Sequence, residues 1–163
     1  MEERVRYCVR PAGAGDLAAI VAQAVALWGG PTRDHRPHLR AILAGKPAST
    51  LPLVLFVAER GARVVGFIEV GLRSHADGCD GARPVGFIEG WFVAARHRGR
   101  GVGGALMAAA EAWAATQGCI ELASDTWADN QPSERAHTAL GFEVVDRCVN
   151  FRKTIGRPRR EKS

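Results

Sequence analysis

The sequence predicts a mixed α/β fold in which helices flank a central sheet. β-rich runs and helical patterns follow one another in the order β-α-α-β-β-β-α-β-α-β-β, and 47% of the 163 residues are apolar. A chain of this length and composition can bury a core without a metal or a disulfide. A run of arginines and glycines joins one long strand to the next helix. We therefore predict a single domain over residues 1–155 and a basic tail over residues 156–163.

The first half of the chain is expected to contain a strand, two helices and a hairpin. Val5–Arg10 predicts the first strand. A helix should follow the N-cap candidate Asp16, because apolar residues then recur at helical spacing, namely Leu17, Ile20, Val21, Ala24 and Trp28. A second, polar helix is expected over His35–Leu43. Two β-rich runs, Leu53–Glu59 and Arg63–Leu72, meet at a short glycine-containing turn and predict a hairpin.

The next segment alternates strand, helix and strand. Val85–Val93 predicts a strand, and the helix that opens at Val102 should end near Gly118. Ile120–Ser124 follows as a strand, so Asp125 falls at its carboxyl end. Open α/β sheets bind ligands at that end of their strands, which makes Asp125 a candidate site residue.

The chain is expected to close with a helix and two strands. Asn130 should begin the helix and Gly141 should end it. Phe142–Asp146 and Cys148–Lys153 then predict a closing strand pair.

Charge is distributed unevenly along the chain. The net charge of +5 and the pI near 9.5 suit an anionic partner. Between Glu121 and Glu134, however, four acidic residues occur without one Lys or Arg, namely Glu121, Asp125, Asp129 and Glu134. The simplest account of these opposite charges is a basic loop that binds an anionic cofactor, beside an acidic wall, formed by these four residues, that binds a cationic acceptor.

The cysteines and the hydropathy pattern indicate the cellular compartment. Cys8, Cys79, Cys119 and Cys148 lie far apart and form no C-x-x-C pair. The sequence contains no signal-peptide pattern and no long apolar span. These features predict a cytoplasmic protein with reduced thiols and no membrane partner.

The run Val85–Ala110 contains an arginine-glycine loop that opens a helix. Its glycines let the backbone approach an anion, and Arg96, Arg98 and Arg100 add cationic donors. The loop could also be a glycine-rich turn with solvated arginines. It formally matches G-x-G-x-x-G, but a dinucleotide fold places that turn after its first strand. A P-loop is excluded because no G-K-[ST] occurs. We interpret the loop as a phosphate cradle.

The segment Arg98-Gly99-Arg100-Gly101-Val102-Gly103 resembles the R/Q-x-x-G-x-G/A pyrophosphate loop of the GCN5-related N-acetyltransferases (GNAT). Among the GNAT enzymes, the aminoglycoside 6'-N-acetyltransferases are the group that this chain resembles, in the runs around Phe87–Val93, Gly118–Thr126 and His137–Phe142. The resemblance implies a GNAT fold with a mixed central sheet of six to seven strands flanked by about four helices. It also implies a homodimer that transfers acetyl from acetyl-CoA to the 6'-amine of an aminoglycoside, a polycationic antibiotic.

The resemblance further implies how acetyl-CoA is held. The pyrophosphate is expected on the loop residues Arg98, Gly99, Arg100, Gly101, Val102, Gly103 and Gly104. The backbone of Trp91, Phe92 and Val93 is expected to pair with the pantetheine arm along an open strand edge. Asn130 could hydrogen-bond the same arm or serve only as a helix N-cap.

Acetyl transfer sets the demands on the catalytic groups. An ammonium group cannot attack a thioester, so the enzyme must remove a proton, orient the amine and stabilise the oxyanion. Glu89, in an otherwise apolar strand, and Asp125, within the acidic wall, are the candidates. The alternatives are a strand glutamate that faces an arginine for Glu89 and a loop-capping aspartate for Asp125.

The departing thiolate raises a separate question. Many GNAT enzymes place a tyrosine, acting as general acid, four residues before the glycine of the Gly-Phe pair, but this chain has His137 there. His137 is therefore the candidate acid. The alternatives are a thiolate that leaves unprotonated and a histidine that only packs against its helix.

Acceptor recognition should depend on acidic and aromatic side chains, because ammonium groups pair with carboxylates and sugars stack on indoles. The candidates are Trp28, Asp77, Asp80, Glu89, Asp125 and Trp127. No metal site is expected: the His35-x-x-His38 pair has a helical spacing but no third ligand, so surface or substrate-loop histidines are expected instead.

Two other functions stay open from the sequence. One is a GNAT enzyme that acts on a different amine, such as a polyamine or a protein N-terminus. The other is a non-enzymatic basic module that binds nucleic acid or an acyl-CoA. The acidic wall and the lack of a helix-turn-helix or aromatic RNA-binding motif argue against nucleic acid.

Overall fold

The structure is a computed structural model that describes residues 7–155. Its strands form one sheet in the order β1-β2-β3-β4-β5, with β1 (Cys8–Pro11), β2 (Leu53–Arg60), β3 (Arg63–Arg73), β4 (Val85–Val93) and β5 (Leu122–Ser124). The four α-helices are α1 (Leu17–Trp28), α2 (Thr32–Leu43), α3 (Val102–Thr116) and α4 (Gln131–Thr138). No helix in this part of the chain is long and apolar enough to cross a membrane.

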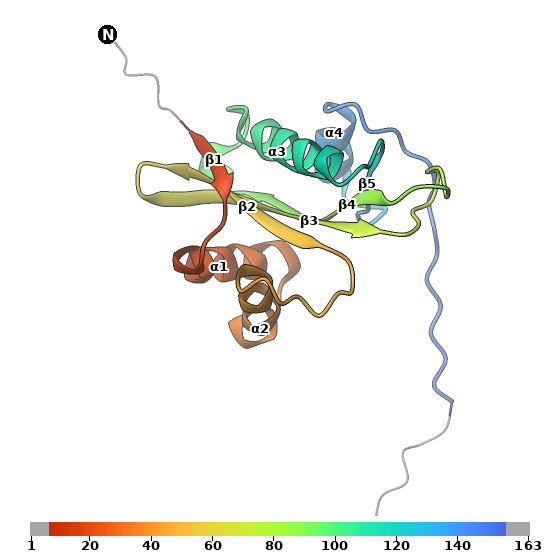
Figure 1. The fold of residues 1–163 in the computed structure, drawn as a ribbon, viewed down its shortest axis with the longest axis horizontal. Coiled ribbons are helices and arrows are strands. Elements are labelled where there is room, and N and C mark those ends of the chain that lie inside the picture. Colours follow the sequence, from red (N-terminus) through yellow and green to blue (C-terminus); the bar gives the residue numbers. More distant parts are fainter. Residues whose placement is uncertain (1–6, 156–163) are drawn as a thin grey trace, which may run out of the picture.

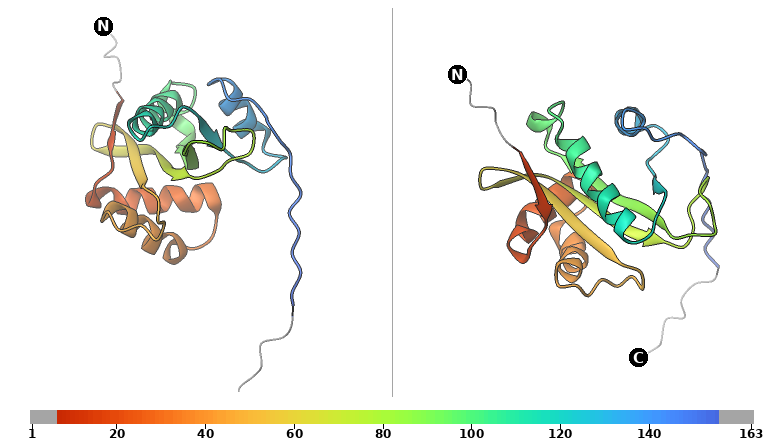
Figure 2. Two further views of the ribbon diagram at one scale, coloured as in Figure 1. Left: turned by 45° about the vertical axis from the view of Figure 1, so that its right-hand side comes forward. Right: turned by 45° about the horizontal axis from the view of Figure 1, so that its top comes forward.

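Helices cover both faces of the sheet (Figures 1 and 2). α1 and α2 pack on one face through a cluster that includes Ile20, Leu39 and Phe67. α3 packs on the other face, where Ile68 and Leu106 belong to a second cluster. Phe67 and Ile68 are neighbours on β3, and they enter opposite clusters because successive strand side chains point to opposite faces. The nearly continuous apolar run of β3 therefore belongs to a strand that is buried on both faces.

The prediction of six to seven strands is wrong, because the described residues form five. Phe142–Asp146 and Cys148–Lys153 make no strand. A strand needs a partner strand. Residues 142–147 lie against the body through side-chain contacts, such as the ion pair of Arg147 with Glu134, without pairing with a strand, and the described chain beyond them runs away from the body (Figures 1 and 2). The first strand begins at Cys8 and ends at Pro11, whereas residues 5 and 6 and the basic tail 156–163 lie outside the described residues.

β4 is the strand that positions the site. It pairs antiparallel with β3 from Gly66↔Val93 to Arg73↔Val85. The register shifts within this ladder, so that Glu89 has no direct partner and forms a bulge. On its other side, β4 pairs with β5 in parallel over only three residue pairs, the last of which is Ile88↔Ser124. Beyond Ile88 the two strands part and leave one edge of β4 open.

Candidate active site

The arginine-glycine loop lies directly after the open part of β4. Gly101 is the N-cap of α3 and has φ of +80°, in the left-handed region that favours glycine. No side chain caps the helix. Gly103 lies under the indole of Trp91, where a Cβ would be 2.9 Å from Trp91 Cζ2. Uncapped amides at the positive end of a helix are suited to an anion.

The three arginines of the loop have different surroundings. The Arg98 Nε donates to the Val93 carbonyl over 2.8 Å, which fixes the side chain against the end of β4. The Arg96 Nε donates to Nε2 of His97 over 3.0 Å. Among residues 7–155, Arg100 makes no hydrogen bond or ion pair through its side chain, and it is exposed. Arg100 is therefore the guanidinium of the loop that is most available to a ligand.

His97 is a buried residue that the sequence did not single out. Its Nδ1 lies 3.1 Å from the Tyr7 hydroxyl, and its Nε2 accepts from Arg96. Burial, followed by the charges of Arg96, Arg60 and Arg100, lowers the pKa of this imidazole. A neutral His97 thus orients one arginine of the loop.

The open edge and the loop fit the predicted acetyl-CoA. A ligand arm with amides can pair with unsatisfied strand groups at residues 89–93, and its phosphates can reach the start of α3. Trp91 also carries a buried Nε1 donor without a partner in the described residues. Arg98 hydrogen-bonds to Val93 and Gly103 contacts Trp91, so the predicted residues Trp91–Val93 and Arg98–Gly104 lie together, with the Val102 side chain buried in the core.

A groove of about 410 Å³ adjoins the fork between β4 and β5. It is lined by the end of β5, the loop that follows, α4 and the segment around residues 142–150. Four of the predicted site residues line it, namely Asp77, Asp125, Trp127 and His137. Asp125 is exposed, and within the described chain its carboxylate accepts no hydrogen bond. It therefore presents a carboxylate that is available to a cationic ligand.

Glu89 does not line this groove and has a partner. Both of its carboxylate oxygens accept from Arg73, over 3.0 Å and 2.7 Å. The Arg73 guanidinium also stacks 3.3 Å above the Phe87 ring. This is the arrangement of the alternative interpretation, a strand glutamate that faces an arginine. To accept a proton, Glu89 would have to keep one oxygen accessible beside Arg73.

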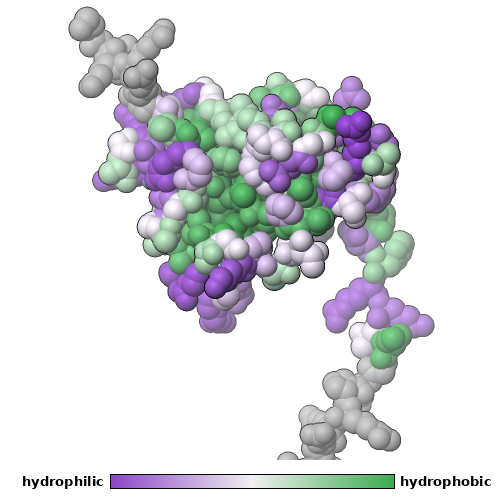
Figure 3. Space-filling model, in the orientation of Figure 1, coloured by the Kyte–Doolittle hydropathy of each residue, from purple (hydrophilic) through white to green (hydrophobic). Residues whose placement is uncertain are grey.

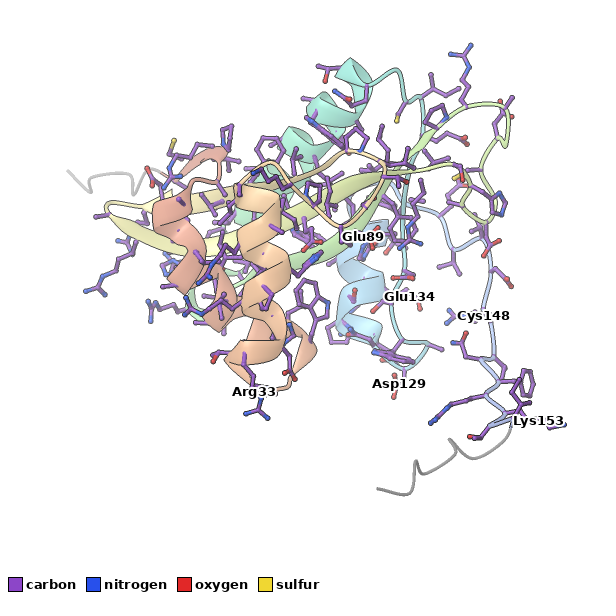
Figure 4. The ribbon with its side chains drawn as sticks, turned by 60° about the horizontal axis from the view of Figure 1, so that its bottom comes forward. Arg33, Glu89, Asp129, Glu134, Cys148 and Lys153 are labelled. Carbon is purple, nitrogen blue, oxygen red and sulfur yellow. The ribbon has the colours of Figure 1, made fainter. Side chains whose placement is uncertain are left out.

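Trp28 lies against the bulge of β4 rather than in the groove. Its indole is 44% exposed and contacts the backbone at Gly90, where a side-chain Cβ would collide with Trp28 Cζ2. Gly90 follows Glu89, so the indole of Trp28 on α1 lies against the part of β4 that carries the Glu89 carboxylate (Figure 4 labels Glu89). The structure therefore divides the predicted acceptor residues between the groove and the α1 side of the sheet.

Other predicted residues have structural partners. The Asp80 carboxylate accepts from the Ala82 amide over 2.9 Å and so shapes its own loop. Asn130 is the N-cap of α4, because its Oδ1 accepts from the Ser133 amide over 3.3 Å. In the acidic wall, Glu134 pairs with Arg147 over 3.0 Å. Figure 4 shows Glu134 on α4 and Asp129 near the start of that helix.

A buried acid on β3 escaped the sequence analysis. Glu69 is 2% exposed, and its Oε1 accepts from His38 Nε2 over 2.7 Å. The hydrogen bond to Glu69 raises the pKa of His38, and the charge of Glu89 contributes. His35 instead donates to the Gly29 carbonyl, so the two histidines do not converge on a metal. Among the described residues, no three potential metal ligands cluster.

Comparison with known proteins shows the family to which this chain belongs. The profile of the acetyltransferase (GNAT) family matches residues 22–142. An aminoglycoside N(6')-acetyltransferase type 1 of Serratia marcescens is 44% identical over 86% of this chain and 94% of its own. The enzyme of that name from Klebsiella aerogenes is 38% identical over 90% of this chain and 96% of its own. A solved structure of AAC(6')-Iy, in complex with the bisubstrate analogue CoA-S-monomethyl-acetylneamine, has a TM-score of 0.82 and 34% identity over 92% of this chain and 99% of that one.

Proposed function

Because the chain belongs to the GNAT family of acetyltransferases, we propose that it transfers the acetyl group of acetyl-CoA to the 6'-amine of an aminoglycoside. One observation carries the proposal: the open edge of β4 connects the arginine-glycine loop to a groove that holds Asp125 and Trp127. A polyanionic donor and a polycationic acceptor can therefore meet at the fork between β4 and β5. Antibiotic resistance would be the biological consequence.

In this proposal the donor lies along β4. The amides of residues 98–104 and the Arg100 guanidinium bind the pyrophosphate, and the backbone of Trp91–Val93 pairs with the pantetheine arm. The arm then runs from the loop back along β4, so its thioester end approaches the fork at Ile88 and Ser124.

The acceptor occupies the groove. Asp125 pairs with an ammonium group and accepts its proton, directly or through water, because its carboxylate has no other partner in the described chain. Trp127, which is 77% exposed, offers an indole face to a sugar ring. Glu89 is ion-paired with Arg73, so we do not assign it as the free base.

Thiol release from acetyl-CoA tests the proposal. The enzyme should release CoA in the presence of an aminoglycoside that carries a 6'-amine. The matched control is an aminoglycoside with a hydroxyl at that position, which should give no release above background. Release with polyamines or peptide N-termini, and none with any aminoglycoside, would replace the proposed acceptor with a different amine.

We infer that the enzyme is a homodimer held by its last described segment. Several apolar side chains of residues 144–155 are more than half exposed, namely Val144, Val145, Val149, Phe151 and Ile155. Figure 3 shows apolar residues on this segment, away from the body of the molecule. Isolated chains rarely leave such a run in water, and a second copy supplies an identical surface for it. Light scattering should give the mass of two chains, and F151K with V149K should give one.

The four cysteines are free thiols, which fits a reducing compartment. We therefore place the enzyme in the cytoplasm, where acetyl-CoA is available.

A further inference from the structure

Ser124 and His137 form a hydrogen-bonded pair at the fork between β4 and β5. The Ser124 Oγ lies 3.0 Å from His137 Nε2. The other ring nitrogen, Nδ1, lies 2.8 Å from the Ser133 carbonyl, which can only accept. Nδ1 therefore carries a proton. In the neutral ring Nε2 accepts from the Ser124 hydroxyl, whereas in the imidazolium Nε2 donates to Ser124 Oγ and leaves the hydroxyl proton free for another acceptor. The tautomer of His137 is thus fixed by its neighbours.

The imidazole is also held by packing. Trp91 lies edge-on to the ring at 5.1 Å between centroids, and Phe142 lies edge-on at 5.2 Å. These contacts come from β4 and from the segment that follows α4, so aromatic rings on two sides restrict the imidazole. Rings that are fixed in this way hold a proton donor or acceptor in one direction.

The pair lies where the reacting sulfur is expected. Ser124 is the last residue of β5 and belongs to the final β4–β5 pair. On the proposed function, on which this inference depends, the pantetheine arm ends at that fork. Ser124 and His137 also line the groove that is assigned to the acceptor.

We propose that Ser124, oriented by His137, donates a hydrogen bond to the sulfur of CoA and passes it a proton as the thioester breaks. The amine nitrogen forms its bond to the acetyl carbon, and the C–S bond breaks with its electron pair on sulfur. In the reacting form His137 is an imidazolium whose Nε2 donates to Ser124 Oγ, so the Ser124 proton goes to sulfur and Ser124 takes the Nε2 proton from His137. Asp125 first takes a proton from the ammonium group and passes it to solvent, then takes the second proton as the amide forms, and solvent reprotonates His137. Ser124 and His137 together replace the tyrosine that this chain lacks.

The pKa of the CoA thiol in the binary complex with CoA tests the proposal without turnover. It is followed by the ultraviolet absorbance of the thiolate. A donor aimed at sulfur stabilises the thiolate, so the bound thiol should have a lower pKa in the wild type and in S124T than in S124A. The control S74A, at an exposed residue outside the site, should match the wild type. Equal values in wild type and S124A would overturn the proposal.

Dependence on the leaving group gives a second readout. S124A and H137Q should slow acetyl transfer from acetyl-CoA by about 100-fold, and much less from an acetyl thioester whose thiol is more acidic. An equal loss with both donors would mean a structural role and overturn the relay, as would an acetyl group found on Ser124 by mass spectrometry. If the wild type itself acetylates no aminoglycoside, the proposed function fails, and the thiol pKa still decides this inference.

Discussion

The two edges of β4 differ sharply. Toward β3 the strand pairs from Val85 to Val93, and the ladder is interrupted only by the bulge at Glu89. Toward β5 the pairing stops after Ile88. The first edge makes a sheet that is buried on both faces, whereas the second leaves backbone groups free for a ligand. One strand thus supplies both part of the core and the open edge, and the point where its pairing stops is where we propose that the chemistry occurs.

The largest expected effect concerns the acceptor side of the open edge. D125N keeps the shape of the side chain and removes its charge, so we expect turnover to fall by about 100-fold or more while acetyl-CoA affinity is unchanged. Steady-state kinetics with calorimetry of acetyl-CoA binding checks both. D34N, at an exposed acid on α2, should leave both unchanged. Equal losses of turnover and cofactor affinity would assign Asp125 a structural role.

The donor side should respond in the opposite way. R100A removes a guanidinium with no partner in the described chain, and charge-assisted contacts to phosphate are worth about 1.5–3 kcal/mol. Acetyl-CoA affinity should therefore fall about 10- to 100-fold, with little change in turnover at saturation. Calorimetry measures it, with R33A on the surface of α2 as the control (Figure 4). Unchanged affinity would remove Arg100 from the pyrophosphate site.

A substitution at the bulge of β4 should destabilise the paired edge. In G90A the new methyl group meets Trp28, and such overpacking costs about 1–3 kcal/mol of unfolding free energy. Denaturant unfolding should show this loss, while G81A, where a Cβ has open space, should not. In a W28A background the same change should cost much less, since the colliding ring is gone. An equal cost in both backgrounds would show that Trp28 is not the cause.

The smallest effect is a pH dependence of stability from His38 and Glu69. The partnered carboxylate raises the pKa of His38 in the folded state above its ordinary value of 6.5. Stabilisation by the pair is therefore full below pH 6.5 and declines as pH rises through the folded-state pKa. The melting temperature of E69Q relative to wild type should show its largest deficit near pH 6 and a smaller one near pH 9. A constant deficit would mean that the charge of His38 plays no part.

The sequence predicted much of this arrangement because its signals are local. The apolar run of β4, the glycines before α3 and the helical spacing after Val102 each occupy neighbouring residues, and the resemblance to the GNAT family is confirmed. Contacts between distant residues had no such signal. Glu69 meets His38 across 31 residues, and Ser124 meets His137 across 13.

The prediction of the two closing strands was wrong for a related reason. The pattern at Phe142–Lys153 shows β propensity, but propensity alone does not make a strand without a neighbour. Likewise, the sequence indicated an acid at Glu89 and the possibility of an arginine partner, but only the fold shows that Arg73 lies across the strand.

Amide hydrogen exchange with and without acetyl-CoA tests the central claim most directly. If the open edge of β4 holds the pantetheine arm, binding should slow exchange within residues 89–93 and 98–104 and leave β1 and β2 unchanged. Protection elsewhere, with the open edge exchanging as fast as in the free protein, would contradict the account.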